Sequence, residues 1–233
     1  MFLQPSTSVV PTLNQDYPEW HLGRQHYALW YLEIFDPALL DYLTALRDHF
    51  SDILYTPNTR QFHITLFICG FFNALNTSDS ILAAEKSAYN DNFSEQQFKQ
   101  QRQQLQQLSF NNIQLNTGQI NSFQSALFIE IQDDFEQLAQ IRQCLNMNND
   151  EIAPIEYCPH ITLGLYKHAL NSDELFARIA KLQQQQFNID FQQLSFGSYQ
   201  AQLLQGPLTV YEQYPLLAHI QDFDKEQQTA CFN

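Results

Sequence analysis

A short segment with the character of a β-strand occurs twice in this chain of 233 residues, and the repeat limits the folds that the chain can adopt. The two segments read FHITLFICG, residues 62–70, and PHITLGLY, residues 159–166. Each has a His and a Thr two positions apart in a run of β-branched and aromatic residues, which is typical of a strand. Because side chains alternate across a strand, the His and the Thr of each segment share one face. These residues are His63 with Thr65, and His160 with Thr162.

The two segments belong to a longer repeat. ALWYLEIF, residues 28–35, is similar to ALFIEIQ, residues 126–132. The same 97 residues separate Glu33 from Glu130 and the first His from the second. Two copies of strand, helix, connection and His strand indicate a duplicated unit. A pseudo-twofold axis between the copies would bring the two His-Thr pairs together across one cleft.

Local signals outside the repeat predict an α+β protein. A hydrophobic strand over 27–35 is followed by Asp36 as a helix N-cap and Pro37 as the first helical residue, which predicts a helix to about residue 50. Further helices are expected after Ser94, over 134–145 and from Ser172 or Asp173 to about 182, and further strands over 110–120, 187–196 and 207–214. The predicted fold has two lobes, related by a pseudo-twofold axis and built from duplicated antiparallel sheets with flanking helices, around a central cleft.

The expected domain organisation is an N-terminal arm over 1–22, a single bilobal domain over 23–215 and a C-terminal tail over 216–233. The arm contains three prolines and is expected to be irregular. A hydrophobic content of 44% is that of a folded protein rather than a disordered one. No apolar run is long enough to span a bilayer, and the first residues lack the pattern of a signal peptide, so we expect a cytoplasmic protein.

The charge and the cysteines bear on partners and cofactors. A net charge of −14 argues against a protein that coats long nucleic acid, because such binding draws on many Lys and Arg contacts to phosphates. The four cysteines form no C-x-x-C pair and have the spacing of neither a zinc site nor a disulfide framework. We expect reduced thiols, no metal, no cofactor and a monomer. A short anionic ligand is compatible with this charge if the few cations converge locally.

With H-x-T-L present twice and the upstream strand repeated, the sequence resembles the 2H phosphoesterase superfamily, and within it the bacterial 2′-5′ RNA ligase and cyclic phosphodiesterase branch. The resemblance covers roughly residues 27–214. It implies a bilobal fold with a central cleft and metal-independent hydrolysis of 2′,3′-cyclic phosphates or 2′-5′ phosphodiester linkages of nucleotides or RNA ends. It also implies that the catalytic set is His63, Thr65, His160 and Thr162.

The residue types suit this chemistry. Hydrolysis of a cyclic phosphodiester needs one group that takes a proton from water and another that protonates the departing sugar oxygen. An imidazole, with an ordinary pKa of about 6.5, can do either near neutral pH. The two threonine hydroxyls can donate hydrogen bonds to the non-bridging phosphate oxygens.

Three further residues are candidates for substrate binding. By strand alternation Phe67 and Tyr166 share the faces of the two histidines, where they could stack on a base, although such aromatics are more often core residues. Arg60, just upstream of the first motif, is a candidate cation for the phosphate, because Lys167 lies on the opposite strand face. The sequence leaves a second function open: a non-catalytic protein that uses the same cleft to bind a nucleotide or an RNA end. Turnover distinguishes the two.

Overall fold

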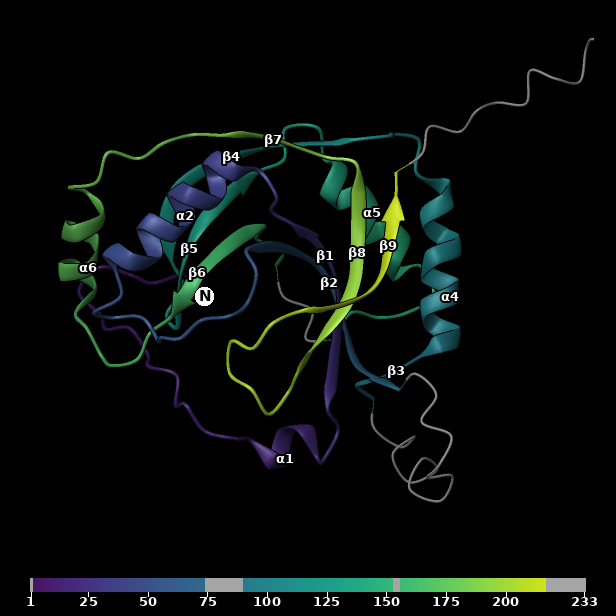
Figure 1. The fold of residues 1–233 in the computed structure, drawn as a ribbon, viewed down its shortest axis with the longest axis horizontal. Helices are drawn as coiled ribbons and strands as arrows, with labels where there is room; N and C mark the ends of the chain where they lie inside the picture. Colours follow the sequence, from purple (N-terminus) through teal and green to yellow (C-terminus); the bar gives the residue numbers. More distant parts are fainter. Residues whose placement is uncertain (1, 74–89, 153–155, 217–233) are drawn as a thin grey trace, which may run out of the picture.

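One curled sheet runs through the whole protein and helices flank it (Figure 1). The computed structural model describes residues 2–73, 90–152 and 156–216. Within these residues the strands are β1 (His26–Glu33), β2 (His63–Asn73), β3 (Asn92–Ser94), β4 (Ile113–Ser122), β5 (Ala126–Gln132), β6 (His160–Leu165), β7 (Asn188–Phe191), β8 (Gln193–Gln200) and β9 (Thr209–Pro215). The helices are α1 (Pro18–His21), α2 (Pro37–His49), α4 (Glu95–Gln104), α5 (Gln137–Asn146) and α6 (Ser172–Ile179), with a 3-10 turn η1 (Leu105–Gln107).

The order of the strands is symmetric about the pair formed by β2 and β6. The sheet reads β7-β4-β5-β6-β2-β1-β8-β9, and the short β3 pairs in parallel with β2 at its far end. We call β2-β1-β8-β9 the first lobe and β6-β5-β4-β7 the second lobe. The neighbours along this path are antiparallel. The predicted α+β fold, with duplicated antiparallel sheets and flanking helices, is therefore confirmed.

The chain crosses between the lobes more often than a simple tandem repeat would require. Strand β4 follows α4 in sequence but lies in the second lobe, and β8 and β9 follow α6 but lie in the first lobe. Helix α2 follows β1 yet contacts β6, and α5 follows β5 yet contacts β2 (Figure 1). Each half of the sequence thus supplies parts of both lobes.

The segment predicted as one strand over 187–196 is two strands in different lobes. Strand β7 pairs with β4, and β8 pairs with β1, so the chain changes lobe at Gln192. The prediction of a single strand was wrong because no Gly or Pro marks the change, and the only signal is a shift of the apolar alternation by one position at the two glutamines of NIDFQQLSF.

The predicted starts of α2 and α4 agree with the structure, whereas α5 begins at Gln137, three residues after the predicted start. The Asp36 carboxylate accepts a hydrogen bond from the Leu39 amide at 2.8 Å, and Pro37 is the first residue of α2. Ser94 forms a capping box with Gln97 at the start of α4. For α6 the cap is Asn171, one residue before the predicted position, and its side chain accepts from the Asp173 amide at 2.8 Å.

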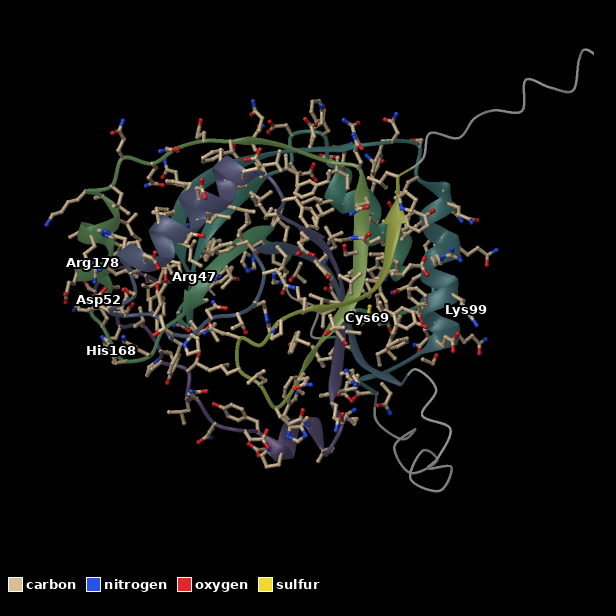
Figure 2. The ribbon with its side chains drawn as sticks, in the orientation of Figure 1. Arg47, Asp52, Cys69, Lys99, His168 and Arg178 are labelled. Carbon is tan, nitrogen blue, oxygen red and sulfur yellow. The ribbon has the colours of Figure 1, made fainter. Side chains whose placement is uncertain are left out.

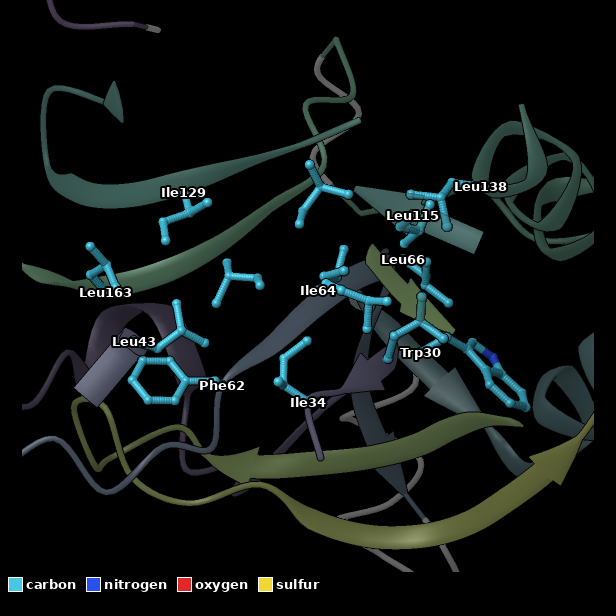
Figure 3. Packing of buried hydrophobic residues seen from close by; sticks show 14 of the residues in the cluster. Trp30, Ile34, Leu43, Phe62, Ile64, Leu66, Leu115, Ile129, Leu138 and Leu163 are labelled. Carbon is cyan, nitrogen blue, oxygen red and sulfur yellow. The ribbon is translucent and has the colours of Figure 1, made fainter. Parts of the chain in front are cut away.

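The larger hydrophobic cluster of the described residues continues across the seam between the lobes (Figure 3). Ile64 of β2 and Ile161 of β6 are both 0% exposed and pair with each other at that seam. Leucines of α2 and α5 pack against the same side of the sheet. Fully burying a side chain of this size contributes about 1.5–3 kcal/mol. The two lobes are therefore held at a fixed angle by the core beneath the cleft.

The arm, expected to be irregular, packs along the second lobe and ends in helix α1. Leu3 and Val9 are 4% and 2% exposed. Four backbone amides of the arm donate to carbonyls of the second half of the chain: Leu3 to Ser122, Val9 to Leu170, Val10 to Gln124 and Thr12 to Tyr166. The predicted tail lies outside the described residues apart from Leu216. No helix in the described ranges combines the length and the apolar character needed to cross a membrane.

Candidate active site

The pairing of β2 with β6 brings the two predicted His-Thr pairs together. These strands are antiparallel, and Ile64 pairs with Ile161. In this register the residue before each isoleucine lies opposite the residue after the other. His63 therefore lies opposite Thr162, and Thr65 lies opposite His160. Both isoleucines are in the core, so the four side chains predicted for the site share the other face of the sheet, at the seam between the lobes.

Both histidines are oriented by the same backbone contact. His63 Nδ1 lies 2.7 Å from the carbonyl oxygen of Gln61, and His160 Nδ1 lies 2.7 Å from that of Cys158. A carbonyl oxygen can only accept, so Nδ1 of each ring carries the proton. This contact leaves Nε2 of each ring as the nitrogen that exchanges protons with a ligand. The two carbonyls are themselves 97 residues apart in the chain, which extends the sequence repeat to the orientation of the imidazoles.

Aromatic rings hold the imidazoles from the neighbouring strands. Tyr31 of β1 meets His63 edge-on at 5.7 Å between ring centroids. In the second lobe Phe128 of β5 meets His160 at 5.1 Å, and Phe123 meets it at 5.0 Å. Tyr31 and Phe128 occupy equivalent positions of the repeat. Each imidazole is thus packed on one side against an aromatic ring of the neighbouring strand.

Burial lowers the pKa of both histidines, because a partly desolvated imidazole loses hydration when it becomes charged. For His63 the pKa falls to about 4, and the charges of Arg60, His160 and Arg47 add to the effect, while the hydrogen bond to Gln61 opposes it. For His160 the hydrogen bond to Cys158 likewise opposes the burial. Both rings are half-buried rather than sealed, so a ligand can still reach them. An anionic phosphate beside them would raise both pKa values again.

A cavity of about 380 Å³ opens over this site. His63, Thr65, Thr162 and Arg60 line it, as the sequence predicts, whereas His160 does not belong to its lining. The remaining lining residues are Gln15, Tyr17, Trp20, Arg47, Asn58, Gln61, Leu165, Tyr199, Ala201, Leu203, Leu204 and Gln205. The size is within the range of small-ligand sites.

Two guanidinium groups border the cavity. Arg60 donates from Nε to the carbonyl oxygen of Gly206 at 2.9 Å, and its guanidinium carbon lies 3.8 Å from the centroid of the Tyr199 ring. Arg47 donates from Nε to the carbonyl oxygen of Leu163 at 2.8 Å and stacks over Phe62 at 3.9 Å. Burial lowers the pKa of Arg47 to about 10, so it stays charged at neutral pH.

The sequence did not point to Arg47 (Figure 2). It lies between Leu46 and Asp48 in an amphipathic helix, where an Arg usually faces solvent. Only the packing of α2 against β6 turns its side chain toward the cavity. The arm residues at the cavity were missed for the same kind of reason, because a Pro-rich segment carries no signal of where it will dock.

Phe67 and Tyr166 do not reach the cavity, and their predicted role in base stacking is corrected. They are 1% and 0% exposed and lie in the core. The cause is one extra residue in each strand directly after the Thr: the β1–β2 register shifts around Leu66, and the β5–β6 register shifts around Leu163. Such a β-bulge reverses the alternation that follows it. Leu66 and Leu163 point into the core (Figure 3), and in β6 it is Leu165, not Tyr166, that lines the cavity.

The site is built on two paired antiparallel strands, one from each half of a duplicated chain. Each strand contributes one His and one Thr, and this arrangement defines a class of protein. Residues 35–202 match the sequence profile of the 2′-5′ RNA ligase superfamily, and the chain belongs to this superfamily. The predicted resemblance to 2H phosphoesterases is thereby confirmed.

Solved structures similar to this chain include E. coli LigT complexed with NADP+, at 10% identity over 83% of this chain and 99% of that one, with a TM-score of 0.47. E. coli LigT complexed with 3′-AMP is 13% identical over 82% of this chain and 98% of that one, with a TM-score of 0.47. Kluyveromyces marxianus Usb1 is 13% identical over 83% of this chain and 98% of that one, with a TM-score of 0.45. No curated protein sequence matches the chain.

Proposed function

We propose that this protein is a metal-independent phosphodiesterase that hydrolyses 2′,3′-cyclic phosphates or 2′-5′ linkages of nucleotides or short RNA ends. The observation that carries the proposal is the matched orientation of two imidazoles. Each has Nδ1 held by a backbone carbonyl at 2.7 Å, and each lies on a strand that pairs with the strand of the other. Membership in the 2′-5′ RNA ligase superfamily supports the same class of reaction.

In the proposed reaction one imidazole, neutral at Nε2, takes a proton from the attacking water. The new bond forms between the water oxygen and phosphorus, and the bond from phosphorus to the leaving ribose oxygen breaks. The second imidazole, protonated at Nε2, gives its proton to that ribose oxygen. Because burial lowers the pKa of His63 to about 4, we assign the neutral, proton-accepting role to His63 and the donating role to His160.

The remaining polar groups stabilise the phosphate. Thr65 and Thr162 each lie opposite a histidine and donate their hydroxyl hydrogens to non-bridging oxygens. Arg47 and Arg60 offset the negative charge that grows on these oxygens in the transition state. The cations border one cavity of a chain whose net charge is −14, which favours a nucleotide or a short RNA end over long nucleic acid.

A turnover assay tests the proposal. Purified protein is incubated with nucleoside 2′,3′-cyclic phosphates and with 2′-5′ dinucleotides, with and without EDTA, beside the His63→Ala variant. We expect hydrolysis that EDTA leaves unchanged and that His63→Ala abolishes. Binding of the product nucleotide without any turnover would instead support a non-catalytic binding protein. Activity that is lost with EDTA and restored by a divalent ion would contradict the metal-independent mechanism.

A further inference from the structure

Part of the cavity lining is apolar or aromatic, and we call this part the wall. Two segments far apart in sequence form it. Tyr17 and Trp20 come from the arm and helix α1, and Ala201, Leu203 and Leu204 come from the connection between β8 and β9. The same cavity holds His63 and Thr65, so this wall and the proposed phosphate site face one space. The proposed hydrolysis does not use any of these five side chains.

The aromatic part of the wall is held in place from behind. The Trp20 ring packs against Tyr27 at 5.0 Å and against Phe71 at 5.2 Å between centroids, and both of those rings are buried. Trp20 itself remains 38% exposed. The hydroxyl of Tyr17 donates to the carbonyl oxygen of Leu13 at 3.0 Å, which fixes the direction of that ring. The indole is thus anchored at one side and open at the other.

The aliphatic part is tied to the same region of the chain. The Ala201 amide donates to the carbonyl oxygen of Gln25 at 2.8 Å, and the Gln202 side chain donates to that of Arg24 at 3.0 Å. These bonds connect the β8–β9 connection to the residues that follow α1. Leu203 nevertheless remains 48% exposed. A fixed indole and a fixed leucine that stay in contact with water beside a polar site are typical of a surface that covers an apolar part of a ligand.

Tyr199 joins the wall to the cationic side of the cavity. It lies near the end of β8, and its ring carries the Arg60 guanidinium at 3.8 Å. The same cavity therefore contains both charged and hydroxyl groups, at Arg60 and Thr65, and an aromatic surface, at Trp20. A nucleotide has this arrangement, with a phosphate on the ribose and a flat base beyond it.

We infer that Tyr17 and Trp20, with the β8–β9 connection, form a nucleobase subsite in which the base stacks on the indole while the phosphate lies at His63, Thr65 and Thr162. The inference rests on the proposed function and extends it, because it assigns the residues that hold the base of the nucleotide. Stacking on an aromatic side chain tolerates any base, since every base has a π-face. The subsite thus sets affinity for a nucleoside end more than it selects one base.

Steady-state kinetics on two substrates test the subsite. One is adenosine 2′,3′-cyclic phosphate, and the other is the base-free 1-O-methylribose 2′,3′-cyclic phosphate. We expect Trp20→Ala to raise the KM for the nucleotide about tenfold or more, with kcat nearly unchanged, as expected for loss of a base–aromatic stack. Trp20→Phe restores most of the affinity. The base-free substrate shows no such difference between the variants.

Leu22→Ala is the matched control, because Leu22 is 44% exposed at the end of the same helix but does not line the cavity. It should leave the KM for the nucleotide unchanged. Equal losses for both substrates in Trp20→Ala would show that the indole only supports the fold of α1 and would overturn the inference. An unchanged KM for the nucleotide would overturn it as well.

Fluorescence gives a readout that does not need turnover. The chain has two tryptophans, and Trp30 is 0% exposed whereas Trp20 is 38% exposed. Adenosine 3′-monophosphate should quench the emission of Trp20, ribose 5-phosphate should not, and Trp20→Phe should abolish the quenching. Quenching without hydrolysis would support the base subsite and refute the proposed enzyme activity. Hydrolysis with equal efficiency on both substrates and no quenching would support the activity and refute the subsite.

Discussion

The two imidazoles are expected to act as one unit. Replacing either His63 or His160 with Ala should lower kcat by about a hundredfold or more, because each half of the proton transfer needs the other. The double variant should be little worse than either single variant. His168→Ala is the control, since His168, labelled in Figure 2, is exposed and does not line the cavity. Near wild-type turnover in either single variant, with an unchanged circular dichroism spectrum, would show that these residues are structural.

The threonines should matter less than the histidines. Thr65→Ala and Thr162→Ala each remove a hydroxyl that steadies the phosphate, but neither removes a group that transfers a proton. We expect a fall in kcat/KM smaller than that of His63→Ala for the same substrate. Thr162→Ser, which keeps the hydroxyl, should recover most of the loss. A Thr→Ala variant that is as inactive as His63→Ala would mean that the phosphate contact, not proton transfer, limits the rate.

The pH dependence follows from the lowered pKa values. Burial disfavours the charged imidazole, so His63 stays neutral down to a pH of about 4. His160 must be protonated to donate, and its pKa also lies below the ordinary 6.5. The profile of kcat/KM, which reports the free protein, should therefore be a bell with its maximum on the acidic side of neutrality. A maximum above pH 8 would contradict the lowered pKa values of the two histidines.

At the scale of the strands, the repeat sufficed to predict β2 and β6 and the face that carries the histidines. It did not predict which face the side chains after Thr65 and Thr162 occupy. The bulges at Leu66 and Leu163 fall in the runs LFIC and LGLY, where no polar residue marks the change of strand face. That is why Phe67 and Tyr166 were expected in the cleft. Arg47 and Trp20 were missed because each reaches the cavity only through the packing of another element.

The contact between β2 and β3 depends on one glycine. Gly70 has φ of 101°, and a Cβ there would collide with the backbone carbonyl of Asp91. Gly23 has φ of 79°, but a Cβ there would meet nothing within 4 Å. We expect Gly23→Ala to cost about 1–2 kcal/mol in the free energy of unfolding, for the backbone conformation alone. Gly70→Ala should cost more than Gly23→Ala, because β3 must also move away. Urea unfolding of the two variants measures this difference, and equal losses would refute the role of the collision.

At the scale of the molecule, the arm belongs to the folded body. Val9 is 2% exposed and Val10, its neighbour, is 52% exposed. We expect Val9→Ala to lower the free energy of unfolding by about 1–2 kcal/mol, for the loss of buried methyl groups. Val10→Ala should stay within about 0.5 kcal/mol of the unaltered protein. If both variants unfolded at the same denaturant concentration as the parent, the arm would not be docked in solution.

The duplication was visible in the sequence because it preserves residue types and spacing. The exchange of strands between the lobes was not visible in the sequence, because no local sequence signal specifies which strands form hydrogen bonds with each other. NIDFQQLSF contains no Gly or Pro, yet it supplies β7 at the edge of the second lobe and β8 between β1 and β9 in the first lobe. Pseudo-symmetry therefore predicted that the two histidines meet, but not which segments complete the sheet around them.

The late position of β8 in the chain has a consequence for synthesis. Strand β1 lies between β2 and β8 in the finished sheet, and β8 spans Gln193–Gln200. A nascent chain therefore carries β1 with one unpaired side until more than 160 further residues have left the ribosome. An unpaired strand side is a template for pairing with other chains. Contacts between residues so far apart also form slowly. The chain crossing that places β8 beside β1 therefore also leaves one side of β1 open to pairing with other chains until β8 has been synthesised.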